Sequence, residues 1–299
     1  MLDYTNLKAL ATVVETGGFE RAARVLCITQ SAVSQRIRAL EERIGQSLLI
    51  RSVPVTATPA GKRLLRHYHQ VALLESELGS ELNADDPHKP TQIAIAVNAD
   101  SLATWFLPAL SPLFARYGWL MKLIVDDESY THNLLKNGEA VGCVTTNAEP
   151  MAGCSAEFLG VMRYRCVATP EFIERFFAAG LTQDALAKAP AVIFSTKDRL
   201  HERFLAKHFS LPSSGFYQHT VPSSEGFLDA ICQHLGYGMV GHLQADKLIA
   251  AGVLIDLCPS VTMDVALYWQ HWNIKAKYTT IIYRALAVAA RQVLGEKTA

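Results

Sequence analysis

The spacing of apolar residues near the N-terminus predicts three helices in close succession. Residues 5–15 and 19–26 each repeat apolar side chains at helical spacing, and Gly17 and Gly18 separate the two stretches. Thr29 suits the N-cap of a third helix, which Gly45 ends. This third helix is expected to bury a single apolar stripe made of Val33, Ile37, Leu40 and Ile44.

The pattern then changes twice before residue 91. Residues 48–56 predict a two-stranded wing, and Thr58 is expected to cap a long helix with Pro59 at its first position. A long helix cannot hide an apolar edge from water by itself, so that edge packs either on its own chain or against a second copy; we favour the second copy. The edge consists of Leu64, Tyr68, Val71, Leu74 and Leu78. The polar stretch 83–90 is expected to be a linker.

From residue 91 onward, short apolar strands alternate with helices, which predicts a parallel α/β sheet. Strands are expected at 93–97, 121–125, 140–144, 166–168, 191–194, 216–221, 239–240, 254–257 and 265–269. Helices are expected at 101–117, 130–137, 170–177, 200–208, 224–235 and 277–294. This order indicates two lobes, between which the chain crosses near Arg163 and Met263.

The exposed face of the third helix carries short polar groups and long donors, which are side chains that contact base edges and phosphates when a helix enters the major groove. The candidate DNA-binding residues are Thr29, Gln30, Ser31, Ser34, Gln35, Arg36 and Arg38, with Arg51 and Lys62 expected on the DNA backbone. The formal net charge is +0, which by itself argues against nucleic acid. Residues 1–66, however, hold ten Lys and Arg against five Asp and Glu, so the basic charge lies on this segment.

The run TQSAVSQRIRALEERIGQSLLIR, followed by PVTATPAGKRLL, resembles the winged helix-turn-helix of the LysR-type transcriptional regulators. The match includes residues 34–37, Leu40-Glu41, Gly45 and Arg51, while Gln35-Arg36 departs from the order common in the family. The resemblance implies a domain 1–58 that is an all-α winged helix-turn-helix, then a linker and dimerisation helix with hinge at 59–90. It also implies a two-lobed, periplasmic-binding-protein-like α/β effector region, with lobe I at 91–163 plus 264–299 and lobe II at 164–263.

Ligands of such sheets bind beyond the carboxyl ends of the strands, and this rule selects polar residues at four strand exits. The candidate effector-binding residues are Asn98, Asp100, Ser101, Asp126, Asp127, Glu128, Thr145, Thr146, Ser223, Ser224 and Glu225. A helix N-terminus attracts a carboxylate and an acidic cluster attracts a cation, which together suit a basic amino acid. Ser101 and Ser224 would also serve as ordinary N-caps, and the three acids as a solvated loop.

The segments CITQSAVSQRI, VNADSLATWFLPAL and PSSEGF resemble the ArgP/LysG subgroup of the same family. That resemblance implies lysine or arginine as effector, control of amino-acid export or of lysine- and arginine-related genes, and no bound cofactor. It implies double-stranded DNA, RNA polymerase and a homodimer as partners, with a dimer of dimers as an open alternative. A replication-origin or chromosome-architectural role, and an amino-acid-binding protein without a DNA role, are the competing interpretations.

Other chemistry finds little support in the sequence. Gly236, Gly238 and Gly241 spell G-x-G-x-x-G, but a helix is expected before them, where a dinucleotide site needs a strand. His67, His69, His201 and His208 have no zinc-like spacing with acids or cysteines, and no G-x-S-x-G turn occurs, so we expect no enzyme. The six cysteines are scattered without C-x-x-C, and no signal or membrane-length apolar run occurs, which predicts a cytoplasmic, nucleoid-associated protein.

Overall fold

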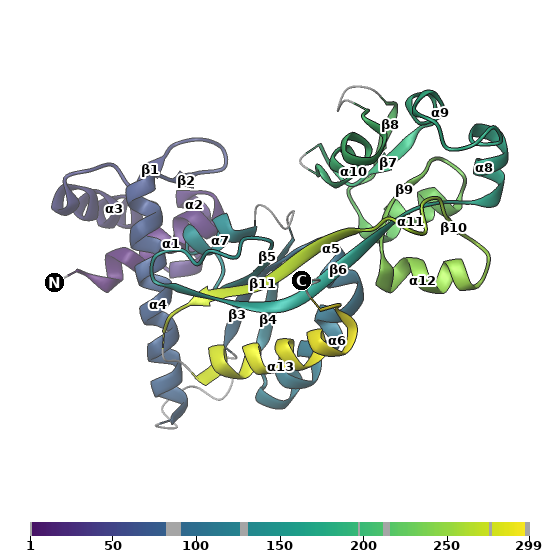
Figure 1. Cartoon of the computed structure of the whole chain (residues 1–299). Helices are drawn as coiled ribbons and strands as arrows, with labels where there is room; N and C mark the ends of the chain where they lie inside the picture. Colours follow the sequence, from purple (N-terminus) through teal and green to yellow (C-terminus); the bar gives the residue numbers. More distant parts are fainter. Residues whose placement is uncertain are drawn as a thin grey trace.

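The computed structural model describes residues 2–81, 91–125, 131–196, 198–211, 216–274 and 277–296. An N-terminal domain, the long helix α4 and two lobes follow one another along the molecule (Figure 1). The N-terminal domain, here called the reader domain, has its own hydrophobic core. Its elements are α1 (Tyr4–Thr16), α2 (Phe19–Leu26), α3 (Gln30–Ile44), and the antiparallel strands β1 (Leu49–Ile50) and β2 (Thr56–Ala57).

Local capping residues fix the ends of these helices, as the sequence predicts. Gly17 and Gly45 end α1 and α3 in the left-handed conformation, with φ of 71° and 74°. The Thr29 hydroxyl accepts a hydrogen bond from the Ala32 amide (3.2 Å) and caps α3. The stripe of α3 is buried at Val33, Ile37 and Leu40, so the helix-turn-helix packs as expected.

Helix α4 (Pro59–Glu81) is shared between the two halves of the molecule. It begins at Thr58, whose hydroxyl donates to the Ser47 carbonyl (2.8 Å) and accepts from the Gly61 amide (3.1 Å). Leu65 is buried in the core of the reader domain, while Leu73 is buried in the core of the lobes. Of the predicted apolar edge, Leu64, Tyr68 and Val71 are half-buried, whereas Leu74 and Leu78 are exposed at 43% and 54%.

Lobe I consists of a central group of parallel strands with helices around it. Its strands β3 (Gln92–Val97), β4 (Leu120–Val125) and β5 (Gly142–Thr145) pair in the order β4, β3, β5. Its helices are α5 (Ala99–Ser101), η1 (Leu102–Phe106), α6 (Leu107–Tyr117), α7 (Thr131–Lys136) and α13 (Lys277–Val293). The segment expected as one helix at 101–117 therefore starts earlier, at Ala99, and includes a π-helical turn at η1.

Two long antiparallel strands, β6 (Cys154–Ala168) and β11 (Met263–Trp272), run diagonally from lobe I to lobe II (Figure 1). The prediction of an all-parallel sheet is therefore wrong: within the described residues, the sheet is mixed, in the order β10-β6-β11-β5-β3-β4, with β9 also on β6. The crossing segments near Arg163 and Met263 lie in this pair, where Arg163 is opposite Asp264. Only the apolar end of β6 was expected, because the rest of the strand is stabilised by a partner about a hundred residues away.

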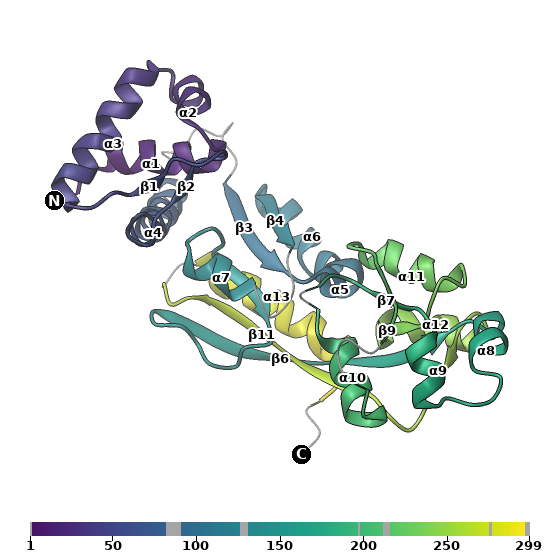
Figure 2. The same cartoon turned by 90° about the horizontal axis from the view of Figure 1, so that it is seen from above.

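Lobe II lies at the far end of the long strands (Figure 2). Its strands are β7 (Ala191–Ile193), β8 (Gln218–Thr220), β9 (Gly238–Gly241) and β10 (Ile255–Asp256). Its helices are α8 (Pro170–Phe176), α9 (Gln183–Lys188), α10 (Leu200–Phe209), α11 (Ser224–Cys232) and α12 (His242–Ala250), of which α9 and α12 were not expected. Among the described residues, no helix combines the length and apolarity that a membrane span requires.

Candidate functional site

The first candidate surface is the N-terminal half of α3, which lies at the outer side of the reader domain, away from the lobes (Figure 2). Its exposed residues there are Gln30, Ser31, Gln35 and Arg38, and Arg51 is exposed where β1 leads into the wing. The buried stripe faces the opposite way, into the domain. A helix face with exposed polar and basic side chains is the geometry that a major groove accommodates.

Hydrogen bonds order the start of α3. The Gln30 Nε2 group donates to the Ser34 hydroxyl (3.3 Å), and the Thr29 and Ser31 hydroxyls lie 2.9 Å apart. Thr29 therefore caps α3 and stabilises the start of the helix, in addition to being a candidate DNA contact. Two of the basic candidates are more sheltered: Arg36 is half-buried, and Lys62 lines a cavity between the reader domain and lobe I.

The second candidate site lies between the lobes and is centred on Asp100 in the first turn of α5. Its Oδ2 accepts a hydrogen bond from the Tyr164 hydroxyl (2.7 Å), and its Oδ1 accepts one from the Ser224 hydroxyl (2.9 Å). Ser224 belongs to α11 of lobe II, so one carboxylate links the two lobes across 124 positions of sequence. A change in lobe position must therefore change the surroundings of Asp100.

Two polar side chains beside Asp100 are buried without a partner among the described residues. Asn98 Oδ1 and Ser101 Oγ are both inaccessible, in residues exposed at 2% and 0%. An unpaired buried polar atom costs about 1–3 kcal/mol, so such atoms are expected where a ligand or water completes them. The π-helical turn η1, which follows directly, is a form found often at functional sites.

The structure brings some of the other candidates to this place and separates others. Thr145 is buried at the end of β5, next to β3, and Thr146 is half-buried. Ser223 and Glu225 are exposed. The predicted acids Asp126, Asp127 and Glu128 lie outside the described residues.

The two predicted capping serines have other roles than expected. The N-cap positions are Asn98 and Ser223, and Ser223 accepts the capping bond from the Gly226 amide (3.2 Å). Because each helix begins one to three residues away from the expected cap, Ser224 is free to donate to Asp100 and Ser101 faces inward. Neither serine caps a helix.

Tyr164 is the inter-lobe residue that the sequence did not indicate. It lies in the middle of β6, is 3% exposed, and orients Asp100 through its hydroxyl. No motif marks it. A buried tyrosine needs a hydrogen-bond partner. The sequence would have indicated Tyr164 only if a strand had been expected through 154–165.

Cysteine and metal chemistry gain no support from the geometry. No group of three His, Cys, Asp or Glu side chains within the described chain is arranged to hold a metal ion. Burial raises the pKa of the Cys143 and Cys166 thiols, which therefore carry little thiolate. These two cysteines are explained as small core residues.

Comparison with known proteins identifies the class. The family model described as "Bacterial regulatory helix-turn-helix protein, lysR family" matches residues 4–62. The HTH-type transcriptional regulator ArgP of Aeromonas salmonicida is 47% identical over 293 residues, covering 98% of both chains. The chain belongs to the LysR family of DNA-binding transcriptional regulators, a non-enzymatic class, and within it to the group of ArgP and LysG.

Solved structures agree over the full length. The crystal structure of ArgP from Mycobacterium tuberculosis superposes with a TM-score of 0.87 at 40% identity, covering 99% of this chain and 100% of that one. Full-length LysG from Corynebacterium glutamicum with bound effector Arg superposes with a TM-score of 0.78 at 33% identity, covering 98% and 100%. The predicted winged helix-turn-helix and two-lobed α/β effector region are confirmed.

Proposed function

We propose that this regulator responds to a basic amino acid, arginine or lysine, that binds between the two lobes. The observation that carries the proposal is the oxygen-rich site at Asp100, where Asn98 Oδ1 and Ser101 Oγ are buried and lack a partner among the described residues. Asn98 Oδ1 suits an N–H donor of an amino acid, and the Ser101 hydroxyl is able to donate to its carboxylate. The LysG relative, whose structure holds arginine, supports this ligand class.

In this proposal, the carboxylate and the cationic side chain of the ligand contact different parts of the site. The α-carboxylate lies near Ser101 and the first helical turn, which starts at Ala99. This helix continues through η1 and α6 to Tyr117. The cationic end points toward Asp126, Asp127 and Glu128, which follow β4 in the sequence. Asp100 links lobe I to lobe II through Ser224.

Regulation follows from the two-lobed geometry. A ligand that contacts both lobes favours one arrangement of them, and only such a differential contact shifts the equilibrium of the DNA readers. We infer a homodimer that pairs through the outward edge of α4, with Leu74 and Leu78 in the seam. The dimer acts on promoters of amino-acid export or lysine- and arginine-related genes through RNA polymerase, either alone or as a dimer of dimers.

Titration calorimetry of the full chain tests the effector. L-arginine or L-lysine should bind, and citrulline, which has the shape of arginine without its charge, should bind more weakly. Ser101→Ala should raise the Kd about tenfold to a hundredfold, since a hydrogen bond to a charged group contributes roughly 1.5–3 kcal/mol.

The matched control is Ser111→Ala, an exposed serine in α6 of the same continuous helix, whose hydroxyl donates only to the Leu107 carbonyl (2.7 Å). It should leave the Kd unchanged. Absence of heat with both basic amino acids at millimolar concentration, or equal binding of citrulline, would contradict the assignment. A footprint on genomic DNA with and without arginine then tests the regulatory response separately.

A further inference from the structure

The turn 137–139, which connects α7 to β5, touches the backbone of the linker helix α4. Gly138 has φ of 79°, and a Cβ atom built on it would lie 2.5 Å from Arg66 Cα and 2.7 Å from Arg66 N. No side chain fits at that distance. Lobe I and α4 therefore meet at this point with their backbones in direct contact.

Hydrogen bonds make the turn and α7 a fixed part of lobe I. The Gly138 amide donates to the Leu135 carbonyl (3.1 Å), and Asn137 Nδ2 donates to Glu139 Oε1 (3.0 Å). The buried Trp272 donates from Nε1 to the same Leu135 carbonyl (3.4 Å). The turn therefore moves with the lobe and does not yield independently of it.

The other end of α7 is attached beside the candidate effector site. The Thr131 hydroxyl donates to the Val144 carbonyl (2.6 Å), directly before Thr145 at the end of β5. Helix α7 thus joins the ligand-side end of β5 to the contact with α4. A displacement of that strand end is passed along a short, firmly held helix.

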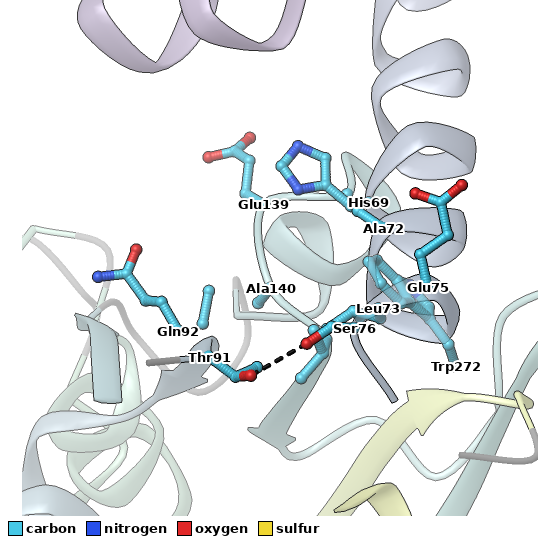
Figure 3. Close-up of a pocket in the computed structure, with 13 residues that line it drawn as sticks. His69, Ala72, Leu73, Glu75, Ser76, Thr91, Gln92, Glu139, Ala140 and Trp272 are labelled. Carbon is cyan, nitrogen blue, oxygen red and sulfur yellow. Dashed lines mark hydrogen bonds between the residues drawn. The ribbon is translucent and has the colours of Figure 1, made fainter. Parts of the chain in front are cut away.

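Two cavities of about 470 Å³ each flank the Gly138 contact. One lies between α4 and the start of β3, and Figure 3 shows His69, Glu75 and Ser76 of α4 around it, with Glu139 across from them. The second lies between the turn, the end of α1 and the wing. Beyond Gly138, the Ser76 and Thr91 hydroxyls meet at 3.0 Å and Leu73 enters the core, so α4 touches lobe I at several places between Arg66 and Ser76.

We propose that the turn 137–139 is the pivot through which lobe I sets the orientation of α4 and hence of the reader domain, with Gly138 as the positioning residue. The cavities on both sides leave room for α4 to tilt about this contact, and the backbone approach prevents sliding. The regulatory use of this pivot rests on the proposed effector response, whereas its mechanical role does not.

The test compares Gly138→Ala with Gly153→Ala. Both glycines have φ of 79°, so both substitutions place a strained alanine, but a Cβ at Gly153 meets nothing within 4 Å. Any difference between the variants reports the collision with Arg66. DNA affinity is measured with and without arginine on a fragment that the wild-type protein selects from random sequence, and hydrogen exchange is followed at the amides of α4.

The expected result is that Gly138→Ala loses more thermal stability than Gly153→Ala because of the collision, and that only Gly138→Ala increases exchange in α4 and alters DNA affinity without arginine. The arginine-dependent change in affinity, about fivefold or more for a typical coupling, should be lost in Gly138→Ala and kept in Gly153→Ala. Equal behaviour of the two variants, or a Gly138→Ala protein like wild type, overturns the pivot.

Two further arms keep the test decisive. Should Gly138→Ala fail to fold, Ser76→Ala removes the bond to Thr91 across the same contact without backbone strain, and Ser111→Ala is its control. Ser76→Ala should shift exchange and coupling in the same direction, and no shift overturns the proposal. If the wild-type protein shows no response to arginine, the proposed effector is wrong. Hydrogen exchange in α4 and DNA affinity without arginine still test the pivot in that case.

Discussion

The reader domain and the effector region place their polar groups in opposite ways. In the reader domain, most candidate contacts lie on one helix, within residues 29–38, and Gln30, Ser31, Gln35 and Arg38 are exposed. In the effector region, Asp100, Tyr164 and Ser224 come from three distant segments and lie at an interior junction. A DNA-reading surface is therefore visible as a local pattern, whereas a ligand site between lobes exists only after the chain has folded.

Helix α4 belongs to both regions, and its faces can be tested one by one. Leu65 and Leu73 are buried in two different cores, while Leu74 and Leu78 face outward. The first two should matter within a protomer, and the last two between protomers. Substitutions along this single helix therefore separate folding from association.

The largest effect is expected from Leu74→Asp combined with Leu78→Asp. Each leucine is about half exposed in the protomer, so its burial in a symmetric seam contributes about half of the 1.5–3 kcal/mol of a full burial. The pair should therefore lose roughly 3 kcal/mol or more of association free energy, to which the aspartates add the cost of desolvating their charges, and become monomeric. Sedimentation at micromolar concentration measures this. A mutant that is still a dimer would place the seam elsewhere, and unchanged unfolding of the monomer is the control.

Leu73→Ala should act on folding instead. This side chain is 8% exposed in the core of the lobes, and truncation of a buried leucine costs about 2–5 kcal/mol. Urea unfolding, followed with a probe in each region, should show the loss in the effector region. A loss below about 1 kcal/mol would mean that α4 does not dock on lobe I in solution.

The structure of the reader domain could be predicted from the sequence more completely than that of the effector region. The ends of α1 and α3 were predicted correctly because Gly17, Thr29 and Gly45 act on their immediate neighbours. The assignments of individual residues of α3 to DNA contacts stay predictions. The helix ends of the reader domain can therefore be predicted from the sequence, because each depends on a residue close to it in the chain.

The effector region was predicted only in outline. Most strands and helices were placed within a few residues, but β6 was expected at three residues and spans fifteen, because its partner β11 lies far away in the chain. Tyr164 was missed for that reason. Asp100 and Ser224 were chosen as candidates, yet nothing in the sequence indicated that they bond to each other.

Acid stability gives a third test at the junction of the two regions. Burial, with a smaller effect of Lys122, lowers the pKa of His69 from 6.5 to about 4, although Glu15 Oε1 lies 3.9 Å from its Nε2. His69 is neutral in the folded protein, and the unfolded chain takes up its proton first. Stability should therefore fall between pH 6.5 and pH 4 by up to about 3 kcal/mol, and change no further below.

The comparison with His69→Gln isolates this contribution. The buried His201, with a pKa lowered by burial to about 3, adds its own acid loss in both proteins. Burial raises the pKa of Glu15, which acts in the opposite sense: its contribution is lost as pH rises. The His69→Gln protein should lose less stability than wild type from pH 6.5 to 4, measured by urea unfolding; parallel curves would contradict the buried state of His69.

The smallest effect is expected on the reader helix, where a single contact is removed. Ser34 is half-buried, accepts a hydrogen bond from Gln30, and lies on the side of α3 predicted to face the groove. Losing one base contact costs about 1–3 kcal/mol of discrimination, so Ser34→Ala should weaken binding to the selected DNA and leave random DNA nearly unaffected. Arg51→Ala, which removes an exposed wing charge, should weaken both and lower the salt slope by about 1. Binding curves on the two DNAs across a salt series separate the outcomes. Equal losses for Ser34→Ala on both DNAs would make this face of α3 a phosphate-binding surface. The residues that read the bases would then have to lie outside the stretch that the sequence predicts.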